Sequence, residues 1–337
     1  MRNLRINRGT IKLENLPRVV SYASVAGKKE SEGPLGKSFD IVSKDSLFDE
    51  KSFERAEAKM QQLSLACALN KAKLNYDDID MIFAGDLLNQ CISSSFGIRK
   101  TEIPFVGLYG ACSTMALSLC LAALAVDSGA AEMTAAVTSS HFCSAERQYR
   151  FPLDYGCQRP QTAQWTVTGS GAVILGKNGR AAVDKICFGQ VTDLGIKDAN
   201  NMGAAMAPAA ACVIERFLND TKTKPTDYDA IFTGDLGFTG TKLLYAVLEK
   251  DGIDIKNVHN DCGMMIFDRE KQDVHSGGSG CGCSASVLTS YILKKVESGE
   301  YKNILFCATG ALLSPTSTMQ GESIPCIAHI VNFVNLQ

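Results

Sequence analysis

The fold is decided by a stretch that this chain carries twice, as DIDMIFAGDL at residues 78–87 and as DYDAIFTGDL at residues 227–236. Each copy is a short apolar run that ends in Gly-Asp, which is the pattern of a buried strand meeting a loop. A helix is predicted before the first copy, over residues 53–74, because apolar residues recur there at helical spacing. The chain thus contains a repeated unit.

A second pair of related segments follows the first pair in the same order. The segment CSTMALS at residues 112–118 corresponds to GCSASVL at residues 282–288, and each leads through a Ser-Gly turn to an apolar strand, over residues 133–138 and 303–308. A repeat of roughly 150 residues indicates a duplicated domain. We therefore expect buried parallel strands beneath helices, with sites where strand ends meet helix N-termini.

The amino-acid composition excludes several classes of function and predicts a cellular location. Residues 1–50 are polar and rich in Lys, Gly and Ser, and we expect an ordered but irregular arm. A net charge of -2 gives no broad positive field, so nucleic acid is not an expected partner. The 13 cysteines lie mostly in apolar stretches, which predicts free thiols in a reducing compartment. No signal peptide or membrane span is expected, so composition alone predicts a cytoplasmic location.

Cys112 is the leading candidate for chemistry. It lies in YGACSTMA at residues 109–116, at the start of a long apolar helix and after a glycine that permits a tight turn. A helix N-terminus favours the thiolate, which is the nucleophilic form of cysteine. The alternative is a small residue packed at a helix start, and the local sequence leaves both open.

Three histidines and a glycine-rich loop are further candidates. His141, His259 and His275 follow apolar runs in polar or glycine-rich turns, where a histidine can act as base, donor or ligand, or simply be solvated. His329 is expected to be structural. The loop at residues 277–285, GGSGCGCSA, could direct N–H groups at an anion or allow two helices to pack closely. Its C-x-C spacing differs from that of zinc sites, and no metal site is expected.

Two of these segments resemble a known superfamily. GACS at residues 110–113 and TGSGAVIL at residues 168–175 are similar to motifs of the thiolase superfamily, most nearly of its ketoacyl synthase III branch. The resemblance implies an α/β thiolase-like fold, with two duplicated βαβαβαββ-type halves packed as five layers, α-β-α-β-α, and usually a homodimer. We place the halves at residues 1–180 and 181–337.

The same resemblance suggests an active site and also a departure from it. The family uses a cysteine with a histidine and a second histidine or asparagine, so Cys112 matches the nucleophile and His259 best matches the first histidine. The branch carries its asparagine in a Gly-Asn-Thr-Ser turn, whereas this chain has GCGCSAS at residues 280–286. His275 is the only nearby substitute, so condensing activity is not the expected function.

A longer resemblance covers essentially the whole chain and is to the stage V sporulation protein AD family. It is carried by AGKKESEGPLG at 26–36, SSHFCSAER at 139–147, RPQTAQW at 159–165, NMGAAMAP at 201–208, HSGGSGCGCSA at 275–285, and GALLSP and GESIP at 310–315 and 321–325. The resemblance implies a non-enzymatic protein of endospore-forming bacteria that binds dipicolinic acid, as its calcium chelate. With the other SpoVA membrane proteins it would move this ligand across the inner forespore membrane during sporulation and out during germination.

These implications lead to a predicted ligand site and two alternatives. A flat pyridine with two carboxylates needs hydrogen-bond donors and an apolar slot. The residues expected to bind it are Cys112, His141, Cys143, His259, Asp261, His275, Gly278 and Cys281. No cofactor is expected, and calcium would enter only with the ligand. The alternatives are an acyltransferase that uses Cys112 with His259, and an assembly factor without any ligand.

Overall fold

The computed structural model describes residues 4–149 and 158–337, and 13 of the described strands form one continuous hydrogen-bonded sheet whose two halves, referred to below as the two sheets, have the same strand order, while β8 and β13 form a separate pair. The first part has the order β6-β5-β7-β9-β3, and the second has β12-β11-β14-β15-β10. The strands of the first part are β3 Arg18–Ala26, β5 Met81–Gly85, β6 Phe105–Gly107, β7 Thr134–Ser140 and β9 Gly169–Gly176. Those of the second are β10 Ala181–Phe188, β11 Ala230–Thr233, β12 His259–Asp261, β14 Asn303–Ala311 and β15 Cys326–Asn335.

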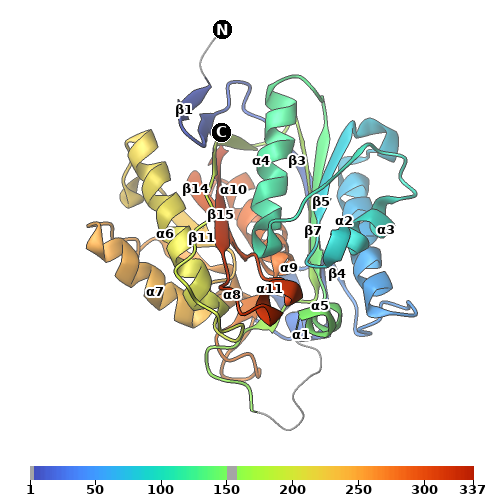
Figure 1. Ribbon diagram of the computed structural model, residues 1–337. Coiled ribbons are helices and arrows are strands. Elements are labelled where there is room, and N and C mark those ends of the chain that lie inside the picture. Colours follow the sequence, from blue (N-terminus) through green and yellow to red (C-terminus); the bar gives the residue numbers. More distant parts are fainter. Residues whose placement is uncertain (1–3, 150–157) are drawn as a thin grey trace.

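The helices complete five layers, α-β-α-β-α (Figure 1). One outer layer contains α2 Phe53–Ala72 and α3 Ile92–Ile98, and the other contains α6 Met202–Thr221 and α7 Gly237–Lys250. Between the sheets lie α4 Thr114–Asp127 and a second helix made of α9 Cys281–Val287, the π-helical turn η6 Leu288–Ile292 and α10 Leu293–Glu297. The thiolase-like α/β fold expected from the resemblance is therefore confirmed, although the boundary at residue 180 stays a prediction.

The repeated stretch forms two equivalent strands, as its pattern predicts. Its two copies form β5 and β11, each of which pairs in parallel with the strand that follows the central helix, β7 or β14. The aspartates of the two copies also act alike. Asp80 accepts hydrogen bonds from the backbone N–H groups that precede β7, and Asp229 does the same before β14. The duplication is thus present in the side-chain contacts as well as in the strand order.

The first 50 residues do not form an irregular arm, and that expectation is wrong. They contain β1 Arg5–Asn7, β2 Thr10–Lys12, α1 Lys28–Ser31, β4 Ile41–Val42 and the central strand β3. Strand β3 is largely buried because small and β-branched residues, RVVSYASVA, fit between the layers. It also touches β10 of the other part of the sheet at Arg18 and Ala182. The smaller elements elsewhere are α5 Phe142–Tyr149, β8 Trp165–Thr166, α8 Cys262–Met265, β13 Gly278–Ser279 and α11 Pro315–Met319.

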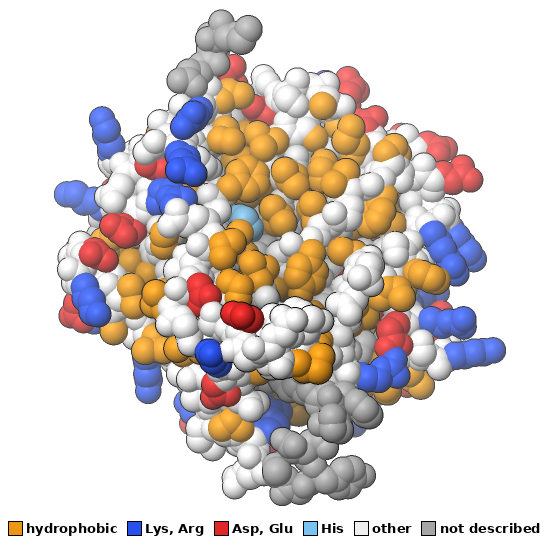
Figure 2. Space-filling model, in the orientation of Figure 1, with side chains coloured by type: hydrophobic (Ala, Val, Ile, Leu, Met, Phe, Trp, Pro, Cys, Tyr) orange, Lys and Arg blue, Asp and Glu red, His pale blue; other side chains and the backbone are white. Residues whose placement is uncertain are grey.

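One face of the molecule carries exposed apolar side chains. Figure 2 shows hydrophobic side chains gathered in the middle of the face that α4 and β15 occupy in Figure 1, with charged side chains around the edge. Strand β6, at one end of the sheet order, is exposed at all three residues, and Phe105 and Val106 are 39% and 38% exposed. Strand β12, its counterpart in the other part, is mostly buried. An exposed apolar edge strand is a surface that natural proteins normally cover.

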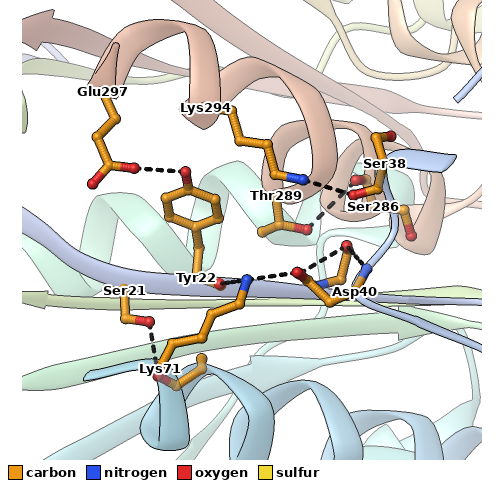
Figure 3. A network of polar contacts seen from close by, with 11 residues as sticks. Ser21, Tyr22, Ser38, Asp40, Lys71, Ser286, Thr289, Lys294 and Glu297 are labelled. Carbon is orange, nitrogen blue, oxygen red and sulfur yellow. Dashed lines mark hydrogen bonds and ion pairs between the residues drawn. The ribbon is translucent and has the colours of Figure 1, made fainter. Parts of the chain in front are cut away.

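A polar network joins β3 to helices of both parts (Figure 3). The Tyr22 hydroxyl lies 2.7 Å from a carboxylate oxygen of Glu297 at the end of α10, while Lys71 of α2 forms an ion pair with Asp40 and donates to the Tyr22 carbonyl. Lys294 of α10 donates to the Ser38 carbonyl. Strand β3 is therefore held from both of its sides. Among the described residues, no helix is long and apolar enough to span a membrane.

Candidate functional site

The site is built around the turn that carries Cys112. Gly110 ends the segment after β6, Ala111 has a left-handed φ of 49°, and the short turn η4 Ala111–Ser113 then leads directly into α4. Strand β14 passes close beneath this turn. A side chain at Gly310 would place its Cβ 2.2 Å from the Gly110 carbonyl oxygen, so only glycine allows this approach. The cysteine is thereby fixed at the helix start, as its sequence context predicted.

A pocket opens beside Cys112 and is lined from both parts of the chain. It contains about 530 Å³ of empty space, part of which is open to solvent. Its apolar lining includes Leu87, Met202, Met206 and Leu313. Its polar lining consists of Tyr109, Cys112, Glu146, Tyr149, Thr166 and Ser279. The two tyrosine hydroxyl groups lie 3.0 Å apart, and that of Tyr149 also donates to the Leu87 carbonyl. The pocket thus combines an apolar slot with several hydroxyl groups.

Asp235 lies directly behind the pocket wall. Its carboxyl group accepts hydrogen bonds from Thr309 Oγ1 at 2.9 Å, the Gly280 N–H at 2.8 Å and Ser279 Oγ at 3.3 Å, and it also interacts electrostatically with the Cys112 thiol. Burial raises the pKa of Asp235 to about 7, against the opposing effect of these hydrogen bonds. A buried carboxyl group with a pKa raised toward neutrality thus lies behind the part of the pocket wall that contains Ser279 and interacts electrostatically with Cys112.

The environment of Cys112 does not produce a thiolate. Burial raises the pKa of the thiol well above its ordinary value, and the neighbouring Asp235 carboxylate raises it further. The N–H of Gly280 and the Ser279 side chain act in the opposite direction without overcoming these effects. Of the two alternatives that the local sequence leaves open for Cys112, these effects favour the buried, protonated thiol over an activated nucleophile, contrary to what the helix N-terminus alone suggests.

His259 and Asp261 lie on β12, just before α8, and their side chains form hydrogen bonds with other groups of the protein. The ring of His259 is hydrogen-bonded on both nitrogens, to Thr233 Oγ1 at 2.9 Å and to the Tyr245 hydroxyl at 3.0 Å. Burial lowers the pKa of His259 to about 4, so the ring is neutral. Asp261 caps α8 by accepting from the Met264 N–H, and it also accepts from the backbone N–H groups of residues 236 and 237.

His141 and Cys143 lie near α5 and are likewise engaged with the protein. His141 Nε2 lies 2.7 Å from the Ser46 carbonyl oxygen, and Nδ1 accepts from the Cys143 N–H at 3.1 Å. Burial lowers the pKa of His141. Cys143 is half-buried, and neither residue is part of the pocket lining.

The glycine-rich loop carries the last three predicted residues. His275 has a left-handed φ of 50° and pairs with Asp273 at 3.1 Å, while Gly278 belongs to β13 and its carbonyl accepts from Gln164. Cys281 is buried against the pocket residues Leu87, Cys112 and Ala145, and its thiol donates to the Ser139 carbonyl. No group of three or more potential metal ligands occurs in the described part of the chain.

Two of the eight predicted residues, Cys112 and Cys281, thus lie together, and Gly278 is next to the lining residue Ser279. The five other predicted residues lie outside the pocket lining. Four of them form hydrogen bonds or an ion pair with other protein groups, and Cys143 lies in α5. Whether any of the eight binds a ligand stays a prediction. The residue missed by sequence reasoning is Asp235. The repeat contained the signal for it, because Asp235 ends the second copy as Asp86 ends the first, and both aspartates are buried with a raised pKa.

The glycine that corresponds to Cys112 in the second repeat is closely packed against the first part of the chain. Gly282 opens α9, and a Cβ there would lie 2.5 Å from the Gly169 carbonyl oxygen and 2.5 Å from Ser140 Oγ. Ser140 Oγ accepts a hydrogen bond from the Gly282 N–H and donates to the Val167 carbonyl. The position that corresponds to Cys112 is therefore filled by the protein's own backbone and serine.

Comparison with known proteins identifies both a family and a fold. The sequence profile of the family Stage V sporulation protein AD (SpoVAD) matches residues 7–334. Stage V sporulation protein AD of Bacillus subtilis (strain 168) is 44% identical over 316 residues, which cover 94% of this chain and 93% of that protein.

Solved structures of synthases share the fold at low sequence identity. The 3-oxoacyl-[acyl-carrier-protein] synthase III from Aquifex aeolicus superposes with a TM-score of 0.57 and 13% identity, covering 94% of this chain and 99% of that one. OleA from Xanthomonas campestris superposes with a TM-score of 0.59 and 11% identity, covering 96% and 97%. At these identities the likeness concerns the fold alone.

Proposed function

This chain belongs to the stage V sporulation protein AD family, and from that premise we propose that it binds dipicolinic acid in the pocket beside Cys112. In this proposal the protein is the ligand-binding component of the SpoVA machinery, which takes dipicolinate into the forespore and releases it in germination. The calcium chelate is the form proposed to be carried. The protein itself would act at the inner forespore membrane through the other SpoVA proteins.

The observation that carries the proposal is the chemistry of the pocket. Dipicolinate is a flat aromatic ring with two carboxylates, and it needs apolar contact for the ring and hydrogen-bond donors for its oxygens. Met202 and Met206 supply flexible apolar surface, which suits a planar ring. Tyr109, Tyr149 and Ser279 line the pocket with hydroxyl groups. Because the Tyr149 hydroxyl donates to the Leu87 carbonyl, the Tyr109 hydroxyl is the one that can turn its hydrogen from Tyr149 to a ligand oxygen. This combination supports a small aromatic acid as ligand.

The same geometry supports binding over catalysis. Acyl transfer needs a thiolate and a base within reach of it. Here the thiol is protonated beside Asp235, and His259 uses both ring nitrogens for Thr233 and Tyr245. We therefore propose that the protein is not an enzyme. Acyl transfer through Cys112 is the competing function, and it predicts a covalent adduct.

Calorimetric titration with dipicolinate, with and without calcium, tests the proposal. Saturable binding is expected, and Tyr109→Phe should weaken it about fivefold, as expected for the loss of one hydrogen bond of about 1 kcal/mol. Tyr76→Phe is the matched control, because Tyr76 is similarly exposed but lies outside the pocket. Incubation with acetyl-CoA and malonyl-CoA, followed by mass spectrometry of the intact protein, completes the test. An acyl adduct on Cys112 without dipicolinate binding would replace the proposal with acyl transfer.

We also propose that two copies associate through the exposed edge strand β6. This edge is able to pair with the same edge of a second chain and extend the sheet. Phe105→Asp should give a monomer at micromolar concentration in sedimentation analysis. Leu243→Asp on α7 is equally exposed, at 39%, and should leave the dimer intact. A wild-type monomer would refute this assembly.

A further inference from the structure

Two side chains of the pocket wall interact with one buried carboxyl group. The Cys112 thiol and the Ser279 hydroxyl both line the pocket, the Ser279 hydroxyl donates to the Asp235 carboxyl behind it at 3.3 Å, and the Cys112 thiol interacts electrostatically with the same carboxyl. While Asp235 is ionised, their hydrogens are attracted away from the pocket toward this carboxylate. An anionic ligand then meets a wall that has sulfur and oxygen lone pairs toward it and a negative charge behind it.

A proton on Asp235 reverses this arrangement. A neutral carboxyl group carries its own hydrogen and can donate it to Cys112 Sγ, which frees the thiol hydrogen to turn toward the pocket. Thr309 and the Gly280 N–H still hold the two carboxyl oxygens in place. The wall gains a donor for a ligand carboxylate, and the repulsive charge disappears.

We infer that the pocket binds its anionic ligand together with one proton, which is taken from solution and held on Asp235 while the Cys112 thiol donates to the ligand. This inference rests on the proposed function and adds its protonation state. The balance is simple, because one proton moves from water to Asp235 and no covalent bond to the ligand forms or breaks.

Other titratable groups near Asp235 do not supply this proton. The groups that face it are the carboxyl of Asp261 and several thiols, namely Cys112, Cys262, Cys281, Cys283 and Cys326. Burial raises the pKa of each of these thiols, so they are already protonated. Asp261 accepts four hydrogen bonds from Thr233 and from backbone N–H groups and has no partner in the pocket wall.

The expected size of the effect follows from linkage. With a pKa of about 7, Asp235 is mostly protonated at pH 6 and mostly ionised at pH 8.5. Binding should therefore weaken roughly 30-fold between these values, with uptake of about 0.1 proton at pH 6 and about 0.9 proton at pH 8. Ordinary carboxyl groups of the ligand are ionised throughout this range, so they contribute little.

Calorimetry with dipicolinate in phosphate and in Tris at pH 8 measures the proton directly, because the buffers differ in ionisation enthalpy. Wild-type protein should show a buffer-dependent heat equal to about one proton. Asp235→Asn should bind with no proton uptake and no pH dependence, since its amide can accept from Gly280 and donate to Thr309. The matched control is Asp86→Asn, the repeat equivalent, whose carboxyl bonds to Leu88 and Ser94 outside the polar wall. The Asp86→Asn variant should still take up about one proton on binding at pH 8.

A second variant makes the test independent of how well the first folds. Cys112→Ala removes the donor that the proton is proposed to release, so its affinity at pH 6 should fall below the wild-type value at pH 6, and its affinity should change less than 30-fold between pH 6 and pH 8.5. Wild-type binding without a buffer-dependent heat at pH 8 would overturn the inference and leave dipicolinate binding intact. Absence of any binding at pH 6 would instead overturn the proposed function, and the inference with it.

Discussion

Glu30 allows the sharpest test of the energetics of this fold. It lies in α1, within the segment AGKKESEGPLG, and is 1% exposed. One carboxyl oxygen accepts the Thr168 N–H at 3.0 Å, and the other has no hydrogen-bond partner among the described residues. Burial raises the pKa of Glu30 from 4.5 to about 7. The folded protein therefore favours the neutral acid.

The sign of the pH effect follows from this raised pKa. The unfolded chain releases the proton near pH 4.5, whereas the folded chain holds it until about pH 7. Stability contributed by Glu30 is thus complete below pH 4.5 and is lost as the pH rises to 7. A shift of this size corresponds to about 3 kcal/mol, most of which falls between pH 5 and pH 8.

Glu30→Gln should remove this loss, because glutamine is always neutral and its amide oxygen can still accept the Thr168 N–H. The variant should be more stable than wild type by about 2–3 kcal/mol at pH 8 and within about 1 kcal/mol at pH 5. Urea unfolding at one protein concentration, at both pH values, measures the difference, and other buried carboxyls cancel in it. Glu32→Gln, an exposed neighbour, should show no such change. A Glu30→Gln difference that stays constant between pH 5 and pH 8 would refute the reasoning.

Three further outcomes are expected. Cys112 should react with iodoacetamide at pH 8 at least about tenfold more slowly in the native protein than in urea, as followed by peptide mass spectrometry, because its thiol is buried and protonated. Tyr22→Phe should lower the free energy of unfolding by about 1 kcal/mol through loss of the contact with Glu297, as measured by urea titration. Lys29→Gln should lower it by roughly 0.5–1 kcal/mol and change the fluorescence of Trp165, because the ammonium group lies 3.6 Å from the ring centroid.

The layered fold could be predicted because its signals are local and occur twice. The copies ending in Asp86 and Asp235 mark equivalent strands, and the helix predicted over residues 53–74 is α2 at Phe53–Ala72. Strand β3 was missed because its alternating small residues lie within a polar region, and only packing between the layers makes it a central strand. Composition over a long window conceals such a strand.

The site could be predicted only in part. The position of Cys112 follows from its turn and helix, but its protonation depends on Asp235, which is more than 100 residues away and meets it only in the folded chain. His259 matches a family motif in sequence, yet Thr233 and Tyr245 determine where its ring lies. The direction of a side chain on a short strand depends on such neighbours, and these neighbours cannot be predicted from the spacing of residues along the chain.

The repeat has a consequence for stoichiometry. Two equivalent helices meet between the sheets, so a duplicated fold could in principle offer two equivalent cavities. At the second position, however, Gly282 is pressed against Gly169 and Ser140, which occupy the space that the pocket has beside Cys112. Each chain should therefore take up a single ligand molecule, and the association of two chains should carry two.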